Sequence, residues 1–214
     1  MTNPPCQLYL ISPLDVGGSF PSQLEAALSA GPVAAFQFRV KDINQHDAAR
    51  LAAPLQEICA AHDTAFIIND SVALAKRLTA DGVHLGQSDG DVREARGELG
   101  ADMQIGVTCH NSRHLAMEAG EAGADYVAFG AFYPTTTKVI EHVAEIETLR
   151  KWAAAMEIPC VAIGGIMPDN AKPLVDAGAD FLAVCSAVWD HADGPAEAVM
   201  AFQKPLSSAR GEDS

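Results

Sequence analysis

The stretch FQFRVK, residues 36–41, alternates apolar and polar side chains, and two of its polar residues are cationic. Such alternation predicts a strand with one apolar face. The opposite face carries Gln37, Arg39 and Lys41, an amide and two positive charges that can together bind a phosphate through several hydrogen bonds. On a surface strand the same polar side chains would only face water. Whether they face solvent or a binding site therefore depends on the sheet in which the strand lies.

Carboxylates follow the next two apolar runs. Asn69 and Asp70 end the run AFIIND, and Asp89 follows the run GVHLG. One or two carboxylates, together with substrate phosphates, are the usual ligands of protein-bound Mg2+. The alternative is that Asn69 and Asp70 cap the following helix. Because Lys138 and the cations of residues 36–41 also follow apolar runs, we favour a metal–diphosphate site.

The last two apolar runs are followed by a different kind of residue. Gly164 and Gly165 precede a helix that Asp169 is predicted to open, and Ser186 precedes the final helix. Glycine lets backbone N–H groups approach an anion closely, and a helix N-terminus adds a favourable field. The glycines could also serve only to make a tight turn, but their position favours a phosphate-binding site.

Cysteine and histidine offer weaker candidates. Cys109 and His110 are adjacent in an extended segment, so their side chains point to opposite faces and cannot form a nucleophile–base pair with each other. His84 lies inside an apolar run, where a hydrogen-bonded structural histidine is more common than a chemical one.

The elements that must position these residues recur along the whole chain. Eight short apolar runs alternate with Ala-, Leu- and Glu-rich stretches. The runs are QLYLIS, AAFQFRV, AFIIND, GVHLG, QIGVTC, YVAFGAF, CVAIGGI and FLAVCSAV, beginning at residues 7, 34, 65, 82, 104, 126, 160 and 181. An Ala-Asp pair precedes three of them, at Asp81, Asp125 and Asp180, as a weak internal repeat.

Helix signals fill the stretches between the runs. Ser22 with Glu25 reads as a capping box, and Asn111 or Ser112 can cap the helix that Gly123 then ends. Strict strand–helix alternation predicts parallel strands and a single α/β domain, a (β/α)8 TIM barrel over residues 1–205 with a flexible tail at 206–214. A doubly wound sheet is the alternative, but no GxGxxG follows the first run.

Composition excludes several classes of function. A formal net charge of −14 over 214 residues weighs against a nucleic-acid partner. No segment approaches the length of a membrane span, and no signal peptide is evident. The five cysteines are widely spaced without a CxxC, which indicates a reducing, cytoplasmic setting without a zinc site or disulfide framework. A homo-oligomer is compatible with this composition.

Taken in order, the strand ends resemble those of the thiamine phosphate synthase family. The matching pieces are QFRVK, IND, ADGVHLGQSD, GVTCH, ADYVAFGAFYPTTTK, AIGGI and AGADFLAVCSAV, from residues 37, 68, 80, 106, 124, 162 and 177. The resemblance implies an Mg2+-dependent transferase that joins two small molecules, a hydroxymethylpyrimidine diphosphate and a thiazole phosphate, and releases diphosphate.

The resemblance also implies roles for individual residues. The pyrimidine diphosphate would be held by Gln37, Arg39, Lys41, Asn69, Thr108 and Lys138, of which Arg39, Lys41, Thr108 and Lys138 would be catalytic. Mg2+ would bind Asp70 and Asp89, and the thiazole phosphate would bind Thr135, Thr137, Gly165, Cys185 and Ser186. Thr108 stands where the family usually has serine, which adds a methyl group to the pocket.

Two alternatives differ in chemistry. A thiazole tautomerase has a similar fold and phosphate site and would use His110 or His84 as a base, but it needs no diphosphate clamp. A non-catalytic barrel would bind a phosphorylated ligand without turnover. The cations and carboxylates at the strand ends favour the synthase.

Overall fold

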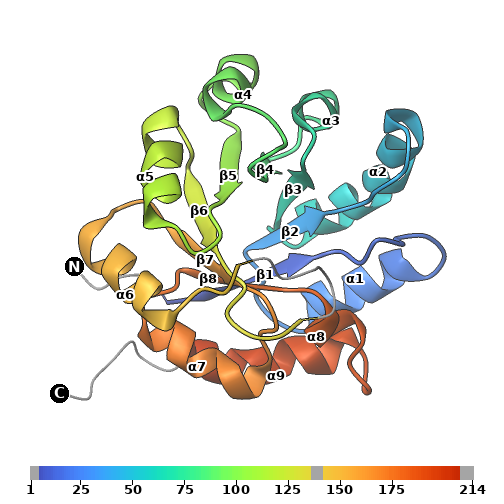
Figure 1. The fold of residues 1–214 in the computed structure, drawn as a ribbon. Helices are drawn as coiled ribbons and strands as arrows, with labels where there is room; N and C mark the ends of the chain where they lie inside the picture. Colours follow the sequence, from blue (N-terminus) through green and yellow to red (C-terminus); the bar gives the residue numbers. More distant parts are fainter. Residues whose placement is uncertain (1–4, 136–141, 208–214) are drawn as a thin grey trace.

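The computed structural model describes residues 5–135 and 142–207, which form a closed barrel of eight parallel strands surrounded by helices (Figure 1). The strands are β1 (Gln7–Ile11), β2 (Ala35–Phe38), β3 (Ala65–Asn69), β4 (Gly82–Leu85), β5 (Gln104–Thr108), β6 (Tyr126–Phe129), β7 (Cys160–Ile163) and β8 (Phe181–Val184). Each pairs with the next in chain order, and β8 pairs with β1. The predicted (β/α)8 barrel is confirmed.

The described helices follow the strands. They are α1 (Phe20–Ser29), α2 (Gln45–Ala61), α3 (Val72–Leu78), α4 (Val92–Leu99), α5 (Arg113–Ala122), α6 (Ile146–Ala155), α7 (Pro168–Asp176), α8 (Ser186–Trp189) and α9 (Pro195–Ser207). The helix α9 packs against both α1 and α7 and extends past the predicted domain boundary at residue 205. None of the described helices is long and apolar enough to cross a membrane.

Two apolar layers result from the alternation along the strands. The outer layer lies between strands and helices and includes Phe36 and Phe38 of β2, with Val40 packed against it. The inner layer fills the barrel and includes Tyr9, Ile11, Ile67, Tyr126, Ala128, Val161 and Ala183. Gln37 is 4% exposed and bonds to Tyr9 of this inner layer, so the polar side chain within β2 points into the barrel and not to solvent.

The strand β2 is shorter than the alternation predicted. It ends at Phe38, and Asp42 then adopts the left-handed conformation with φ of 56°. Arg39 stays attached to the barrel because its backbone N–H donates to the Ser12 hydroxyl at 2.8 Å. Lys41 is exposed and lies beyond the strand.

The Ala-Asp repeat stabilises the amino-terminal end of the barrel. Asp81, Asp125 and Asp180 each accept a hydrogen bond from a backbone N–H of the preceding strand. The donors are Phe66, Ile105 and Cys160, at 2.7, 2.7 and 2.8 Å. This end is opposite to the reactive face of such barrels, so the repeat serves the fold.

Replacing Asp125 by alanine should therefore destabilise the protein by about 2–3 kcal/mol, because the buried Ile105 amide and the Arg96 guanidinium both lose their carboxylate partner. Chemical denaturation measures the change. Asp102→Ala, an exposed aspartate that precedes β5, is the control and should change stability by less than about 0.5 kcal/mol. Equal losses in the two variants would contradict the role assigned to the repeat.

One expected helix start needs correction, and the capping alternative for Asn69 and Asp70 is not observed. The helix α1 begins at Phe20, with Pro21 in its first turn, so Ser22 and Glu25 lie inside the helix and form no capping box. The helix α3 is capped by the Ser71 hydroxyl, which accepts from the Leu74 amide at 3.2 Å, and not by Asn69 or Asp70. Ser112 caps α5, as predicted.

Candidate active site

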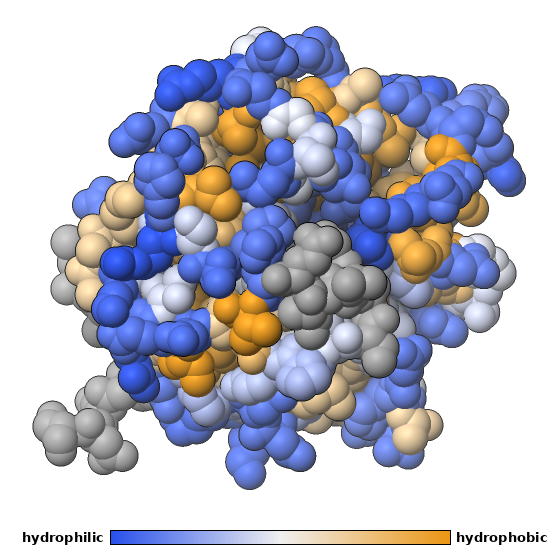
Figure 2. Space-filling view, viewed as in Figure 1, coloured by the Kyte–Doolittle hydropathy of each residue, from blue (hydrophilic) through white to orange (hydrophobic). Residues whose placement is uncertain are grey.

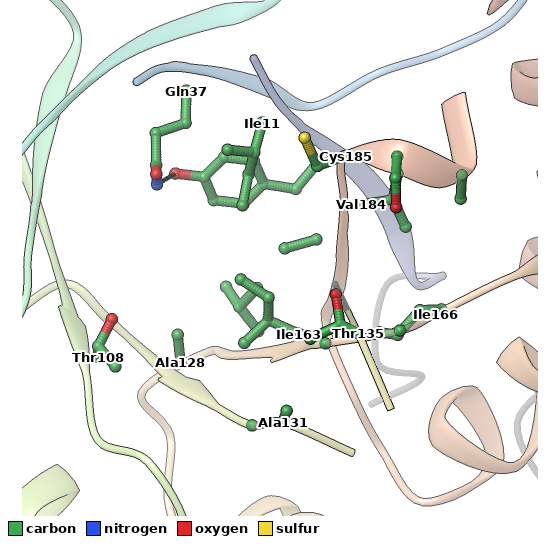
Figure 3. A pocket seen from close by; sticks show the side chains of 18 of the residues that line it. Ile11, Gln37, Thr108, Ala128, Ala131, Thr135, Ile163, Ile166, Val184 and Cys185 are labelled. Atoms are coloured by element: carbon green, nitrogen blue, oxygen red, sulfur yellow. Dashed lines mark hydrogen bonds between the residues drawn. The ribbon is translucent and has the colours of Figure 1, made fainter. Parts of the chain in front are cut away.

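A pocket of about 220 Å³ opens at the carboxyl ends of the strands. The outer surfaces of the helices visible in Figure 2 are mostly hydrophilic. The predicted site residues that line the pocket are Gln37, Arg39, Asn69, Thr108, Thr135, Gly165, Cys185 and Ser186. In Figure 3, Gln37 and Thr108 lie toward one part of the pocket, and Thr135, Ile166 and Val184 line another.

The cationic wall begins at β2. The half-buried Arg39 lines the pocket, and its backbone is fixed in both directions by Ser12, whose hydroxyl accepts from the Arg39 N–H and donates to the Arg39 carbonyl at 3.1 Å. Lys41 lies at the rim, close enough for its charge to lower the pKa of Asp70. Of the two cations, Arg39 therefore lines the pocket and Lys41 does not.

The carboxylates of β3 and the β4–α4 loop lie together. The Asp70 amide donates to the His84 carbonyl at 2.8 Å, and the Asp89 carboxylate accepts from the Gly86 amide at 2.9 Å. Burial, followed by the negative charge of Asp89, raises the pKa of Asp70 above 3.8. Two carboxylates that repel each other in this way are suited to a shared hard cation.

The glycine pair after β7 has a clear structural requirement. Gly164 and Gly165 have φ of 103° and 63°, in the region that favours glycine. A Cβ at Gly164 would collide with Ala131, and a Cβ at Gly165 would collide with the carbonyl of Pro134. Both glycines let the β7 loop pack against the loop after β6, where Thr135 also lines the pocket.

The segment after β8 completes this wall. Cys185 precedes α8, and Ser186 is its first residue. Burial raises the pKa of the Cys185 thiol to about 11, so the side chain is a neutral thiol at neutral pH. Its Sγ donates to the Ser12 carbonyl at 3.6 Å, which joins the end of β8 to the segment after β1.

A row of hydrogen-bonded side chains crosses the barrel interior. Gln37 donates to the Tyr9 hydroxyl at 2.9 Å, and the Tyr9 and Tyr126 hydroxyls are 2.9 Å apart. His84 Nδ1 lies 3.2 Å from the Tyr126 hydroxyl, and His84 Nε2 lies 2.8 Å from the Thr108 hydroxyl. Both ring nitrogens of His84 are thus engaged, as expected of a structural histidine.

The phenols in this row are neutral at ordinary pH. Burial raises the pKa of Tyr9 to about 12, although its hydrogen bonds with Tyr126 and Gln37 act in the opposite direction. Burial also raises the pKa of Tyr126 well above its ordinary value.

The side chains of Cys109 and His110 lie on opposite faces of the barrel wall, as predicted. Cys109 is buried in the outer apolar layer, where burial raises its pKa to about 12, and His110 lines the pocket. The ring of His110 lies 4.5 Å from that of His142, which also lines the pocket. The sequence did not indicate His142, because it follows the loop after β6 without recognisable ligand spacing.

The predicted site residues fall into three groups according to where they lie relative to the pocket. Eight line the pocket, whereas Lys41, Asp70 and Asp89 lie around its rim. Thr137 and Lys138 lie outside the described residues. Tyr9 and Tyr126 were missed, because a tyrosine within an apolar run looks like a core residue and the chemistry of its hydroxyl depends on distant partners.

The fold and the pocket define a (β/α)8-barrel enzyme that has basic, acidic and glycine-containing segments at its carboxyl-terminal mouth. Thiamine monophosphate synthase is the family that matches, over residues 8–188. The chain is 64% identical over 212 residues to the thiamine-phosphate synthase of Erythrobacter litoralis (strain HTCC2594), covering 97% of this chain and 99% of the relative. It is 54% identical to that of Rhodospirillum centenum (strain ATCC 51521 / SW), covering 94% and 98%.

A solved structure agrees with these matches. Thiamine phosphate pyrophosphorylase from Pyrococcus furiosus superposes with a TM-score of 0.83 at 32% identity, covering 96% of this chain and 97% of that one. The chain therefore belongs to the thiamine monophosphate synthase family. The predicted family, fold and transferase activity are confirmed.

Proposed function

We propose that this protein joins a hydroxymethylpyrimidine diphosphate to a thiazole phosphate, giving thiamine phosphate and diphosphate. The observation that supports this reaction best is the division of one pocket between two kinds of wall. Gln37 of β2, Arg39 just after β2 and Thr108 of β5 line one side of the pocket. Gly165 and Ser186 line it from the segments after β7 and β8. Two anionic substrates can therefore enter one pocket and meet between the walls.

The residues fall into two proposed sets. The pyrimidine diphosphate would be held by Gln37, Arg39, Lys41, Asn69, Thr108 and Lys138. The thiazole phosphate would be held by Thr135, Thr137, Gly165 and the backbone at Cys185 and Ser186. Cationic side chains suit the more highly charged diphosphate, and glycine-containing backbone suits a single phosphate.

Asp70 and Asp89 are the proposed ligands of Mg2+. Their fit to a cation rests on the raised pKa of Asp70, to which the negative charge of Asp89 contributes. When bound, Mg2+ would supply positive charge beside the leaving diphosphate. The charge of Lys41 also acts on Asp70, so a cationic side chain is already present near this carboxylate.

The proposed reaction breaks one bond and forms another. The C–O bond between the pyrimidine methylene and the diphosphate breaks, and its electron pair leaves on the diphosphate oxygen. The resulting cation is stabilised by electron donation from the ring amino group, and the thiazole nitrogen lone pair forms the new C–N bond. Arg39 and Lys41 would stabilise the leaving charge, and the two walls would hold the reactants face to face. No strong base is needed.

The partners of this reaction are small molecules, and the proposed compartment is the cytoplasm. The support for a reducing compartment is the sequence pattern of five widely spaced cysteines without a CxxC. Assembly into a homo-oligomer is a further possibility that the reaction itself does not require.

Incubation of the purified protein with both substrates tests the function. We expect diphosphate and thiamine phosphate to form in equal amounts with Mg2+, and to stop forming when a chelator removes it. The matched control is the chelated sample with Mg2+ restored in excess. Absence of product at every Mg2+ concentration would remove the synthase proposal. Isomerisation of the thiazole phosphate alone would identify a tautomerase, and binding without turnover would identify a non-catalytic barrel.

A further inference from the structure

The hydrogen-bonded row Gln37–Tyr9–Tyr126–His84–Thr108 forms the floor of the pocket. Tyr9 lines both this pocket and a second cavity of about 290 Å³ at the amino-terminal end, and Tyr126 lines the second cavity. The paired phenols therefore separate the two spaces. A Cβ at Gly106 would collide with the Tyr126 ring, so a glycine on β5 makes room for this ring inside the barrel.

The number of hydrogens on each side chain of the row indicates which group donates and which accepts in each hydrogen bond. Each phenol has one hydrogen, and the Tyr9 oxygen already accepts from Gln37 Nε2. Within residues 5–135 and 142–207, the other hydrogen-bond partner of the Tyr9 hydroxyl is the Tyr126 hydroxyl, and either oxygen could donate in that bond. With Gln37 already donating to Tyr9, we assign the Tyr9 hydrogen to the Tyr126 oxygen. Tyr126 must then donate to His84 Nδ1, so that His84 carries its hydrogen on Nε2 and donates to Thr108. The Thr108 hydrogen is left for an acceptor in the pocket, which Thr108 lines.

The opposite direction requires a different arrangement at both ends. If Thr108 donated to His84 Nε2, then His84 would donate from Nδ1 to Tyr126, and Tyr126 would donate to Tyr9. The Tyr9 hydrogen would then need the Gln37 amide to turn over and present its oxygen. The two directions thus differ in an observable property, which is the ring nitrogen of His84 that bears the hydrogen.

We propose that Tyr9, Tyr126 and His84 are positioning residues that hold the Thr108 hydroxyl as a donor to the anionic group of the substrate. This inference rests on the proposed function, since it takes the diphosphate as the acceptor. The same direction fixes Gln37 with Nε2 toward Tyr9, which leaves its oxygen as an acceptor for an amino group. The floor of the pocket therefore presents a hydroxyl donor from β5 and an amide acceptor from β2 to one ligand.

Nitrogen NMR of histidine-labelled protein tests the direction without any turnover. The signals of His84 are identified by their loss in His84→Gln. We expect His84 to carry a hydrogen on Nε2 and none on Nδ1, both in the protein alone and after addition of inorganic diphosphate with Mg2+. A hydrogen on Nδ1 in the diphosphate sample would overturn the proposal, as would a doubly protonated ring.

Kinetics then test whether the row acts through Thr108. Tyr126→Phe removes the central hydroxyl but keeps the ring, and should lower kcat/KM for the pyrimidine diphosphate about tenfold. In a Thr108→Val background the same change should cost no more than about twofold, because the hydroxyl to be positioned is already absent. In a Thr108→Ser background the tenfold effect should return. Equal tenfold losses in all three backgrounds would show a merely structural role.

Two further variants complete the design. Tyr9→Phe interrupts the same row and replaces Tyr126→Phe if that variant does not fold. Thr64→Val is the matched control, since the Thr64 hydroxyl is buried but donates to the Val33 carbonyl at 3.1 Å outside the row. It should leave kcat/KM unchanged. If the wild-type protein showed no turnover, the proposed function would be refuted. The His84 tautomer would still decide the direction of the hydrogen bonds in the row.

Discussion

Replacing Arg39 by alanine is expected to lower kcat/KM by roughly 10²–10³-fold while the fold remains intact. Arg39 lines the pocket, and Ser12 bonds both its backbone N–H and its carbonyl, so the backbone that carries the guanidinium is held in place independently of a ligand. Its charge would be needed most as the diphosphate departs, which is why the loss should appear in turnover more than in stability. Steady-state kinetics and circular dichroism measure the two effects.

Two variants separate charge from geometry at this position. Arg39→Lys keeps the charge but loses the planar pair of donors, and should recover only part of the activity. Arg77→Ala removes an exposed arginine from the last turn of α3 and should change neither rate nor fold. A wild-type rate in Arg39→Ala would place Arg39 outside the chemical site, however close it lies to the pocket.

Replacing Asp70 by asparagine should abolish most of the Mg2+-dependent turnover, on the order of 10²-fold or more, while stabilising the metal-free protein. Asp70 has φ of 64°, which asparagine tolerates as well as aspartate does, so the backbone is not strained by the change. The stabilisation arises first because a neutral amide is penalised less by burial than a carboxylate, and second because Asp89 no longer faces another negative charge. Since solvent screens part of this repulsion, we expect at most about 1 kcal/mol, or roughly 2–4 °C in Tm.

The pH dependence of this stabilisation has a definite sign. The folded pKa of Asp70 is raised above 3.8, mainly by burial and then by Asp89. The folded protein therefore holds a proton that the unfolded chain has lost, and the contribution of Asp70 to stability is full below pH 3.8 and is lost as the pH rises through the folded pKa. Thermal unfolding across this pH range should show that the stability of the asparagine variant, relative to that of the wild type, increases as the pH rises.

Asp102→Asn, an exposed aspartate near the opposite end of the barrel, is the control for this pair of measurements. It should leave both the turnover and the pH profile of stability unchanged. If Asp70→Asn kept full activity and full dependence on Mg2+, the assignment of Asp70 as a metal ligand would be wrong.

The fold was predictable because its periodic pattern is local. Each apolar run is followed by its own helix, and eight such units leave few ways to bury every strand other than a closed barrel. Part of the pocket was predictable for the same reason. Once the strands are parallel, their carboxyl ends meet at one face, and polar residues such as Arg39 and Thr108 must gather there.

The boundaries of elements were less predictable. Alternation continued beyond the point at which β2 ends, and Ser71 took the capping position that Asn69 and Asp70 could also have filled. Several residues can satisfy the same free amide at a helix start, so local geometry chooses among them.

By itself, the sequence determined the barrel, the inward row of Gln37 and Arg39, and the gathering of charged residues at one mouth. Only the tertiary structure decided how the floor of that pocket is built. Tyr9 and Tyr126 are separated by 117 positions in the chain, yet their hydroxyls lie 2.9 Å apart inside the barrel. Strand periodicity indicates the face on which a side chain lies, but a hydrogen bond across the barrel depends on closure, register and the space left by Gly106.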